Sequence, residues 1–259
     1  MMQPRGPLAH AIACGLLLAP VFTAASEPLS PVPPPSPIDL DALARGATTV
    51  DISEDLLRAV VVLGNPEVVK FSTAIDLGEG VSAIAWSECS KTRCRGWLGK
   101  LSGGAAYPRL VTKVALTAPP TVFFDDGFTF DAAAFTDVDG DGAKEIVVRY
   151  RATEPPRAAL GSLSHDYVAL YAPKGLALLF VHELRRAGAA SEEACEWKLA
   201  RRGNNLVTSG VCNERSCLEA TDAPARCKPS RTLNELWQRL RGQKRYVGAA
   251  LPERPSGAH

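Results

Sequence analysis

The chain has 259 residues and a formal net charge of +1, and hydrophobic residues make up 46% of it. This length and composition suit one medium domain or two small ones with an ordinary packed core. The balanced charge and the lack of any long basic run argue against nucleic acid or an anionic membrane as partner.

Residues 1–26 have the pattern of a secretory signal peptide. Arg5 supplies the positive charge, an apolar run with three consecutive leucines follows, and small residues favour cleavage after Ala25 or Ser26. The apolar run is shorter than the roughly 20 residues that span a membrane, so we expect a secreted or periplasmic protein with no transmembrane segment in the mature chain. Cys14 leaves a lipid anchor as the alternative, because the residues before it faintly resemble a bacterial lipobox.

A proline-rich linker covers residues 27–40 and should be extended and exposed. A domain then extends over residues 41–250. Its first element is predicted to be a helix that starts at Asp51–Glu54 and stops at Gly64. The valines at 60–62 would also suit a strand, and the sequence leaves both interpretations open.

Alternating apolar residues and short turns dominate the rest of the domain and predict a mainly β fold. Closely spaced strands favour an antiparallel meander, arranged as a β-propeller-like blade or as a sandwich. Asp126-Gly127 suits a hairpin turn that would pair Phe123 with Phe130. The predicted strands are 67–75, 81–87, 94–101, 109–117, 121–125, 128–136, 145–152, 166–172, 176–184, 195–202 and 205–212.

Near the C-terminus, the sequence predicts a short helix and a tail. Thr232–Glu235 fits a capping box, so a helix should follow it as far as Arg241. The tail, residues 251–259, is expected to be disordered.

Six cysteines remain after the signal peptide, and an even number in an exported chain predicts disulfides. Gly203-Asn204 suits a type II′ hairpin turn, and in that register Cys195 lies directly opposite Cys212 at a non-hydrogen-bonded pair. The other four pair by proximity, and the alternative for all six is reduced thiols that are buried or bind metal. The predicted bonds are Cys89–Cys94, Cys195–Cys212 and Cys217–Cys227.

One motif carries recognisable chemistry. Three aspartates alternate at Asp137, Asp139 and Asp141, two glycines allow a tight curl, and Glu145 follows at the ninth position. Each close pair of these carboxylates repels by about 4 kcal/mol near a protein surface, and a cation removes that repulsion. Clustered hard oxygen ligands favour calcium over zinc or copper.

The start of this loop matches an EF-hand, but Val148 stands where an EF-hand requires a bidentate glutamate. Residues 135–150 more closely resemble the FG-GAP/VCBS-type repeats of integrin-like β-propellers, with Glu145 in place of the usual aspartate. The resemblance implies one four-stranded blade reaching residue 184, and a Ca²⁺ ion held by side chains and by the backbone carbonyl of Ala143. The implied ligands are Asp137, Asp139, Asp141, Ala143 and Glu145.

No familiar catalytic motif is present, and no catalytic residue is predicted. His182 lies in register with apolar neighbours and is better explained as a core or edge histidine. His165-Asp166 opens a predicted strand, and a hydrogen-bonded turn explains His165 better than a catalytic dyad.

The preferred interpretation of the sequence is an exported, non-enzymatic calcium-binding β module. It would interact with a protein or a polysaccharide at the cell surface or in the periplasm, and calcium would be mainly structural. The alternative is a secreted hydrolase whose site is not recognisable from motifs. A pocket with convergent titratable groups away from the loop would favour that alternative.

Overall fold

The structure is a computed structural model that describes residues 34–90, 94–116, 127–154, 163–188, 193–214, 231–239 and 245–250. The chain divides into two compact units, Met1–Val32 and Pro33–His259, and every described residue lies in the second. The predicted signal peptide, the lipobox cysteine, the tail and the Cys217–Cys227 bond therefore lie outside the described residues.

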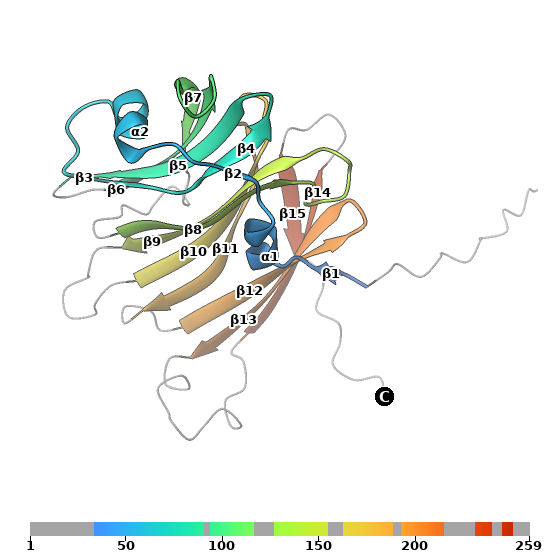
Figure 1. Ribbon diagram of the computed structural model, residues 1–259. Coiled ribbons are helices and arrows are strands. Elements are labelled where there is room, and N and C mark those ends of the chain that lie inside the picture. The colour runs from blue at the N-terminus through green and yellow to red at the C-terminus, as the bar shows by residue number, and fades with distance from the viewer. Residues whose placement is uncertain are drawn as a thin grey trace, which may run out of the picture. The chain divides into compact units, whose positions relative to one another are not determined.

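The predicted mainly β, antiparallel fold is confirmed, and most of its strands form one large sheet (Figure 1). Eight of these strands follow one another in the sheet in chain order, as a meander, and β1 adds to the side of β12. The members are β1 (Ser36–Pro37), β8 (Gly127–Thr136), β9 (Glu145–Glu154), β10 (Leu163–Tyr171), β11 (Leu178–Gly188), β12 (Glu193–Arg202), β13 (Asn205–Glu214), β14 (Arg231–Arg239) and β15 (Tyr246–Ala250).

A second, smaller sheet lies between β1 and β8 in the chain and carries helix α2 (Glu54–Val61). The predicted helix is confirmed: the Ser53 side chain caps it by accepting from the Leu56 N–H, and Leu57 and Val61 are buried. The strands are β2 (Thr49–Val50), β3 (Val68–Phe71), β4 (Ala74–Gly78), β5 (Val81–Cys89), β6 (Cys94–Ser102) and β7 (Arg109–Ala115).

The large sheet buries apolar side chains on both faces. Along β9, Ile146, Val148 and Tyr150 join a core shared with the small sheet, because alternate residues of a strand point to the same face. Val147 points the other way, into a second core covered by helix α1 (Leu40–Arg45). Two sheets that share a core are the arrangement of a sandwich.

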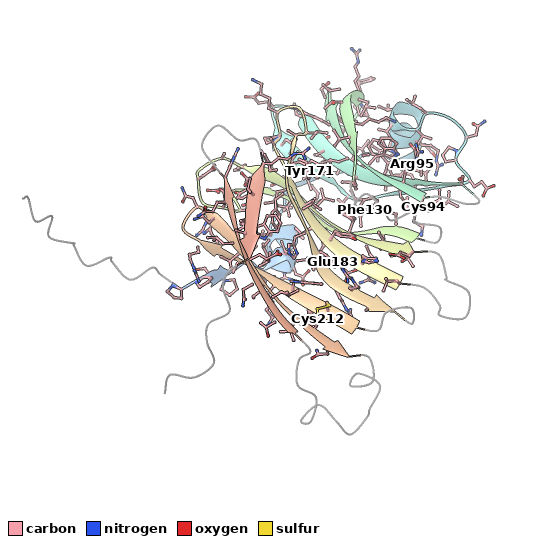
Figure 2. The ribbon with its side chains drawn as sticks, turned by 180° about the vertical axis from the view of Figure 1, so that it is seen from behind. Cys94, Arg95, Phe130, Tyr171, Glu183 and Cys212 are labelled. Atoms are coloured by element: carbon pink, nitrogen blue, oxygen red, sulfur yellow. A yellow bond between two sulfur atoms is a disulfide. The ribbon has the colours of Figure 1, made fainter. Side chains whose placement is uncertain are left out.

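The prediction for the hairpin of β12 and β13 is confirmed in its register. Arg202 pairs with Asn205, and Cys195 pairs with Cys212. Gly203 has a φ of 59°, which a type II′ turn requires at its first central position. The structure contains the Cys195–Cys212 and Cys89–Cys94 disulfides, the latter joining β5 to β6, and Figure 2 labels one cysteine of each bond.

Three predictions need correction or completion. The helix predicted from Thr232 to Arg241 is wrong, since the described part of this segment is strand β14, which pairs with β13 as far as Trp237 and with β15 from Glu235 to Arg239. The single strand predicted over 67–75 is two short strands, β3 and β4, that both pair with β5. The predicted partner of Phe130, Phe123, lies outside the described residues.

The four strands expected for one blade, β8 to β11, do form a meander. The same sheet, however, continues through β12 to β15. Helix α1 and strands β1 and β15 were not predicted, because each is short and depends on partners far along the chain. Strand β1 lies within the expected linker, where Ser36 pairs with Arg201 and Pro37 with Ala200.

Candidate metal centre

The acidic motif forms the loop between β8 and β9, and Glu145 is the first residue of β9. The loop therefore begins and ends on neighbouring strands that are paired from Thr136 and Glu145 onward. A rigid hairpin base fixes the distance between the first aspartates and the glutamate that closes the motif.

The aspartates shape the loop by accepting hydrogen bonds from its backbone. Asp137 accepts from the N–H groups of Gly140 and Gly142 at 2.6 and 3.0 Å. Asp139 accepts from Asp141, which in turn accepts from the N–H of Ala143. Gly140 and Gly142 have φ of 81° and 90°, a region that favours glycine, so the curl expected from the two glycines is present.

Three of the carboxylates converge. Asp137, Asp139 and Glu145 each offer an oxygen, and these oxygens all lie within 4.8 Å of one another. Asp139 and Glu145 are both 1% exposed. Glu145 also accepts a hydrogen bond from the Val138 N–H at 3.0 Å, which ties β9 to the start of the loop.

Burial and mutual repulsion make ionisation of the carboxylates in this cluster unfavourable. Desolvation, with repulsion from Asp139 as the largest charge contribution, raises the pKa of Glu145 to about 7. Burial also raises the pKa of Asp139, although its hydrogen bonds with Tyr246 and Asp141 oppose the shift. Without a cation, the fold thus resists full ionisation of these groups.

Side chains from distant parts of the chain surround the loop. The Tyr246 hydroxyl of β15 donates to Asp139, and Arg239 of β14 donates to Asp141 at 3.0 Å. The Arg201 guanidinium of β12 lies against Gly140, where a β-carbon would come within 2.8 Å of it. Reasoning from the sequence missed all three, because they lie far from the motif along the chain and belong to no motif of their own.

The four predicted carboxylate ligands are thus placed in two groups. Asp137, Asp139 and Glu145 converge as a hard-oxygen donor set that could hold a metal ion. The Asp141 carboxylate is instead engaged by Arg239 and by the Ala143 N–H. Each ionised carboxylate has about four acceptor positions, so the hydrogen bonds within the loop leave lone pairs for a cation.

The two histidines considered in the sequence, His165 and His182, have packing or hydrogen-bonding partners. His165 lies near the start of strand β10, as expected, but its ring contacts Glu154 and Glu183 and is not part of a turn. His182 packs beside Phe180, as expected for a core or edge histidine. Trp86 is fully buried.

A hollow of about 210 Å³ lies at Arg151, Ser164 and Asp166. A separate hollow of about 320 Å³ beside Phe130 is lined by uncharged residues. In the smaller, charged hollow, Arg151 and Asp166 form a bidentate pair with each other at 2.6 and 3.1 Å. Paired charges of this kind are not free to act as acid and base.

No protein-family model, no curated protein and no solved structure matches the chain.

Within the described part of the chain, no helix is long and apolar enough to cross a membrane.

The two disulfides indicate an oxidising, extracellular environment.

Proposed function

We propose that this chain is an exported β module in which the Asp137–Glu145 loop binds a calcium ion, and that the ion stabilises a surface for a protein or polysaccharide partner. The observation that carries the proposal is the convergence of Asp137, Asp139 and Glu145 within 4.8 Å, with two of the three buried. The role of calcium is structural, and no catalytic step is assigned to it.

The physical argument for a bound cation is the unbalanced negative charge of the carboxylate cluster. Two like charges 4 Å apart near a protein surface repel by about 4 kcal/mol, and burial adds a desolvation penalty. The raised pKa values of Asp139 and Glu145 are the consequence. A divalent cation would reverse both effects, because it supplies positive charge and replaces the lost water ligands.

Arg239 supplies part of the compensation from outside the cluster. Its guanidinium contacts Asp141 at 3.0 Å, whereas Asp139 accepts from two neutral donors, the Tyr246 hydroxyl and the Asp141 N–H. The charge of Asp141 is therefore balanced by the protein itself. The inner group, Asp137, Asp139 and Glu145, is the part that a cation would complete.

The interaction role is inferred from the resemblance and from the disulfides. The FG-GAP/VCBS-type resemblance implies binding of macromolecules, and the disulfides fit an extracellular setting. By analogy, calcium would act here by fixing the β8–β9 loop against β14 and β15. The partner would then be bound more weakly when calcium is removed.

The test is thermal unfolding of the oxidised protein in calcium and in excess chelator. Calcium at about 100-fold over its Kd should stabilise the wild type by about 2.7 kcal/mol. Asp137→Asn should lose most of this gain, whereas Asp51→Asn, a matched change at an exposed aspartate, should keep it. Equal midpoints in calcium and chelator for the wild type would contradict the proposal.

A further inference from the structure

A hollow of about 320 Å³ lies where helix α1, the small sheet and strand β8 meet. Pockets for small molecules usually measure about 300–1,000 Å³, so this hollow has room for a molecule of one or two rings. Its lining residues come from α1, β2, β8 and the segment from β3 to β4, and all of them are uncharged. None of these residues belongs to the acidic loop between β8 and β9.

Part of the lining is apolar and held in place by packing. Phe71 of β3 and Phe130 of β8 are both half-buried, and Ile75 of β4 is 2% exposed. The Phe130 ring, labelled in Figure 2, packs on the buried Phe128 ring with the two centroids 5.3 Å apart. Aromatic side chains fixed in this way offer apolar surface to a molecule that enters the hollow.

A β-bulge shapes the hollow on the side of β8. The pairing of β8 with β9 shifts register between Phe130 and Ala132. In a regular strand, residues three apart point to opposite faces of the sheet, yet Phe130 and Ala133 both line this hollow. The extra residue of the bulge allows this arrangement, and bulges are frequent beside functional sites because they redirect side chains.

Hydroxyl groups form the polar part of the lining. The Ser72 hydroxyl accepts from the Ala85 N–H at 3.0 Å and donates to the Thr73 carbonyl at 3.1 Å, so its position is fixed and one lone pair remains. Thr49 and Thr73 are exposed. Within the described part of the chain, the hydroxyls of these two threonines form no hydrogen bond, so both can donate to and accept from a ligand.

We propose that this hollow binds a neutral sugar residue. A charged ligand would lose water without gaining a counter-charge, because every lining residue is uncharged. A wholly apolar ligand would cover the hydroxyls of Thr49, Ser72 and Thr73 without satisfying them. A neutral sugar has an apolar ring face together with hydroxyl groups that donate and accept, so it matches both parts of the lining.

The test is an NMR titration of the full-length, oxidised protein with glucose, galactose and N-acetylglucosamine as separate probes. At least one sugar should bind saturably, with a Kd in the millimolar range, and shift the amide signals of Thr49, Thr73 and Phe130. Thr73→Val, which removes an exposed hydroxyl, should weaken binding about fivefold, the effect of one hydrogen bond. Thr129→Val, beside Phe130 on β8 but outside the hollow, should bind as wild type.

Two further probes test the class of ligand. Glucuronate carries a charge, and cyclohexylmethanol keeps a ring but has a single hydroxyl, so both should bind more weakly than the best of the three sugars. Equal or tighter binding of either probe would contradict the proposal.

The proposal would also be overturned by a wild type that shows no saturable shift with any of the three sugars, or by a Thr73→Val protein that binds as tightly as wild type. Because the hollow shares no residue with the acidic loop, sugar binding does not depend on whether that loop holds calcium. Titrations of the same protein with calcium and with sugar therefore test the two sites separately.

Discussion

Replacing Glu145 by glutamine should stabilise the metal-free protein and remove the stabilisation by calcium. The pKa of Glu145 rises from 4.5 to about 7 on folding, chiefly through burial. At about 1.4 kcal/mol for each pKa unit, this corresponds to about 3 kcal/mol of unfavourable free energy when the group is ionised. The carboxamide oxygen of glutamine can still accept the Val138 N–H, which keeps the local structure.

The sign of the pH dependence follows from linkage. A carboxyl whose pKa is raised in the folded state favours folding while it is protonated, so its contribution is full below about pH 4.5 and is lost as the pH rises through about 7. Metal-free wild type and Glu145→Gln should therefore have similar stability at acid pH. By about pH 8, the variant should be the more stable by up to about 3 kcal/mol.

The assay is urea unfolding in chelator and in calcium at both pH values, with Glu67→Gln as an exposed control. In calcium at about pH 8, the order should reverse, because only the wild type offers the full carboxylate set. A Glu145→Gln protein that is less stable than wild type in chelator at this pH would refute the reasoning.

Two further predictions concern the fold. Removing the Cys195–Cys212 bond by a double change to alanine should lower the free energy of unfolding by about 3 kcal/mol, since the bond closes a 17-residue separation; urea unfolding under oxidising conditions measures this. Gly96→Ala should destabilise by about 1–3 kcal/mol, because its β-carbon would lie 2.3 Å from the buried Phe128 ring. Gly46→Ala, with its nearest contact at 3.5 Å, is the control, and an equal loss there would contradict the packing argument.

The sequence was sufficient to predict most strands, because alternation and turn chemistry are local properties. Gly203-Asn204 set the register of β12 and β13, and with it the pairing of Cys195 and Cys212. The N-cap at Ser53 likewise defined the start of α2. In these places, the local preference and the final fold agree.

Prediction failed where distant partners decide the structure. Residues 231–239 contain a good capping box, yet they form β14 because β13 and β15 pair with both of its sides. The Trp237 ring lies over Gly248, which has no side chain to obstruct it, and its N–H donates to Thr208. Such contacts override helix propensity, which is a weak preference.

The candidate metal centre likewise has one part that local sequence predicts and one part that depends on distant contacts. The spacing of Asp137, Asp139 and Glu145 was enough to expect that their oxygens converge. The roles of Arg239 and Tyr246 were not predictable, because they reach the loop across 98 and 107 residues of sequence. These contacts form because β14 and β15, at one end of the large sheet, lie beside the loop between β8 and β9, at its other end. No local sequence pattern predicts this proximity.

Calorimetric titration of calcium into the oxidised, metal-free protein tests the central proposal most directly. The wild type should show one saturable site with a Kd of about 0.1–1 mM, the range of extracellular modules. Asp139→Asn, which keeps an acceptor for the Tyr246 hydroxyl, should lose that site while its fold is retained. A wild type without saturable binding, or an Asp139→Asn protein that binds calcium equally well, would contradict it.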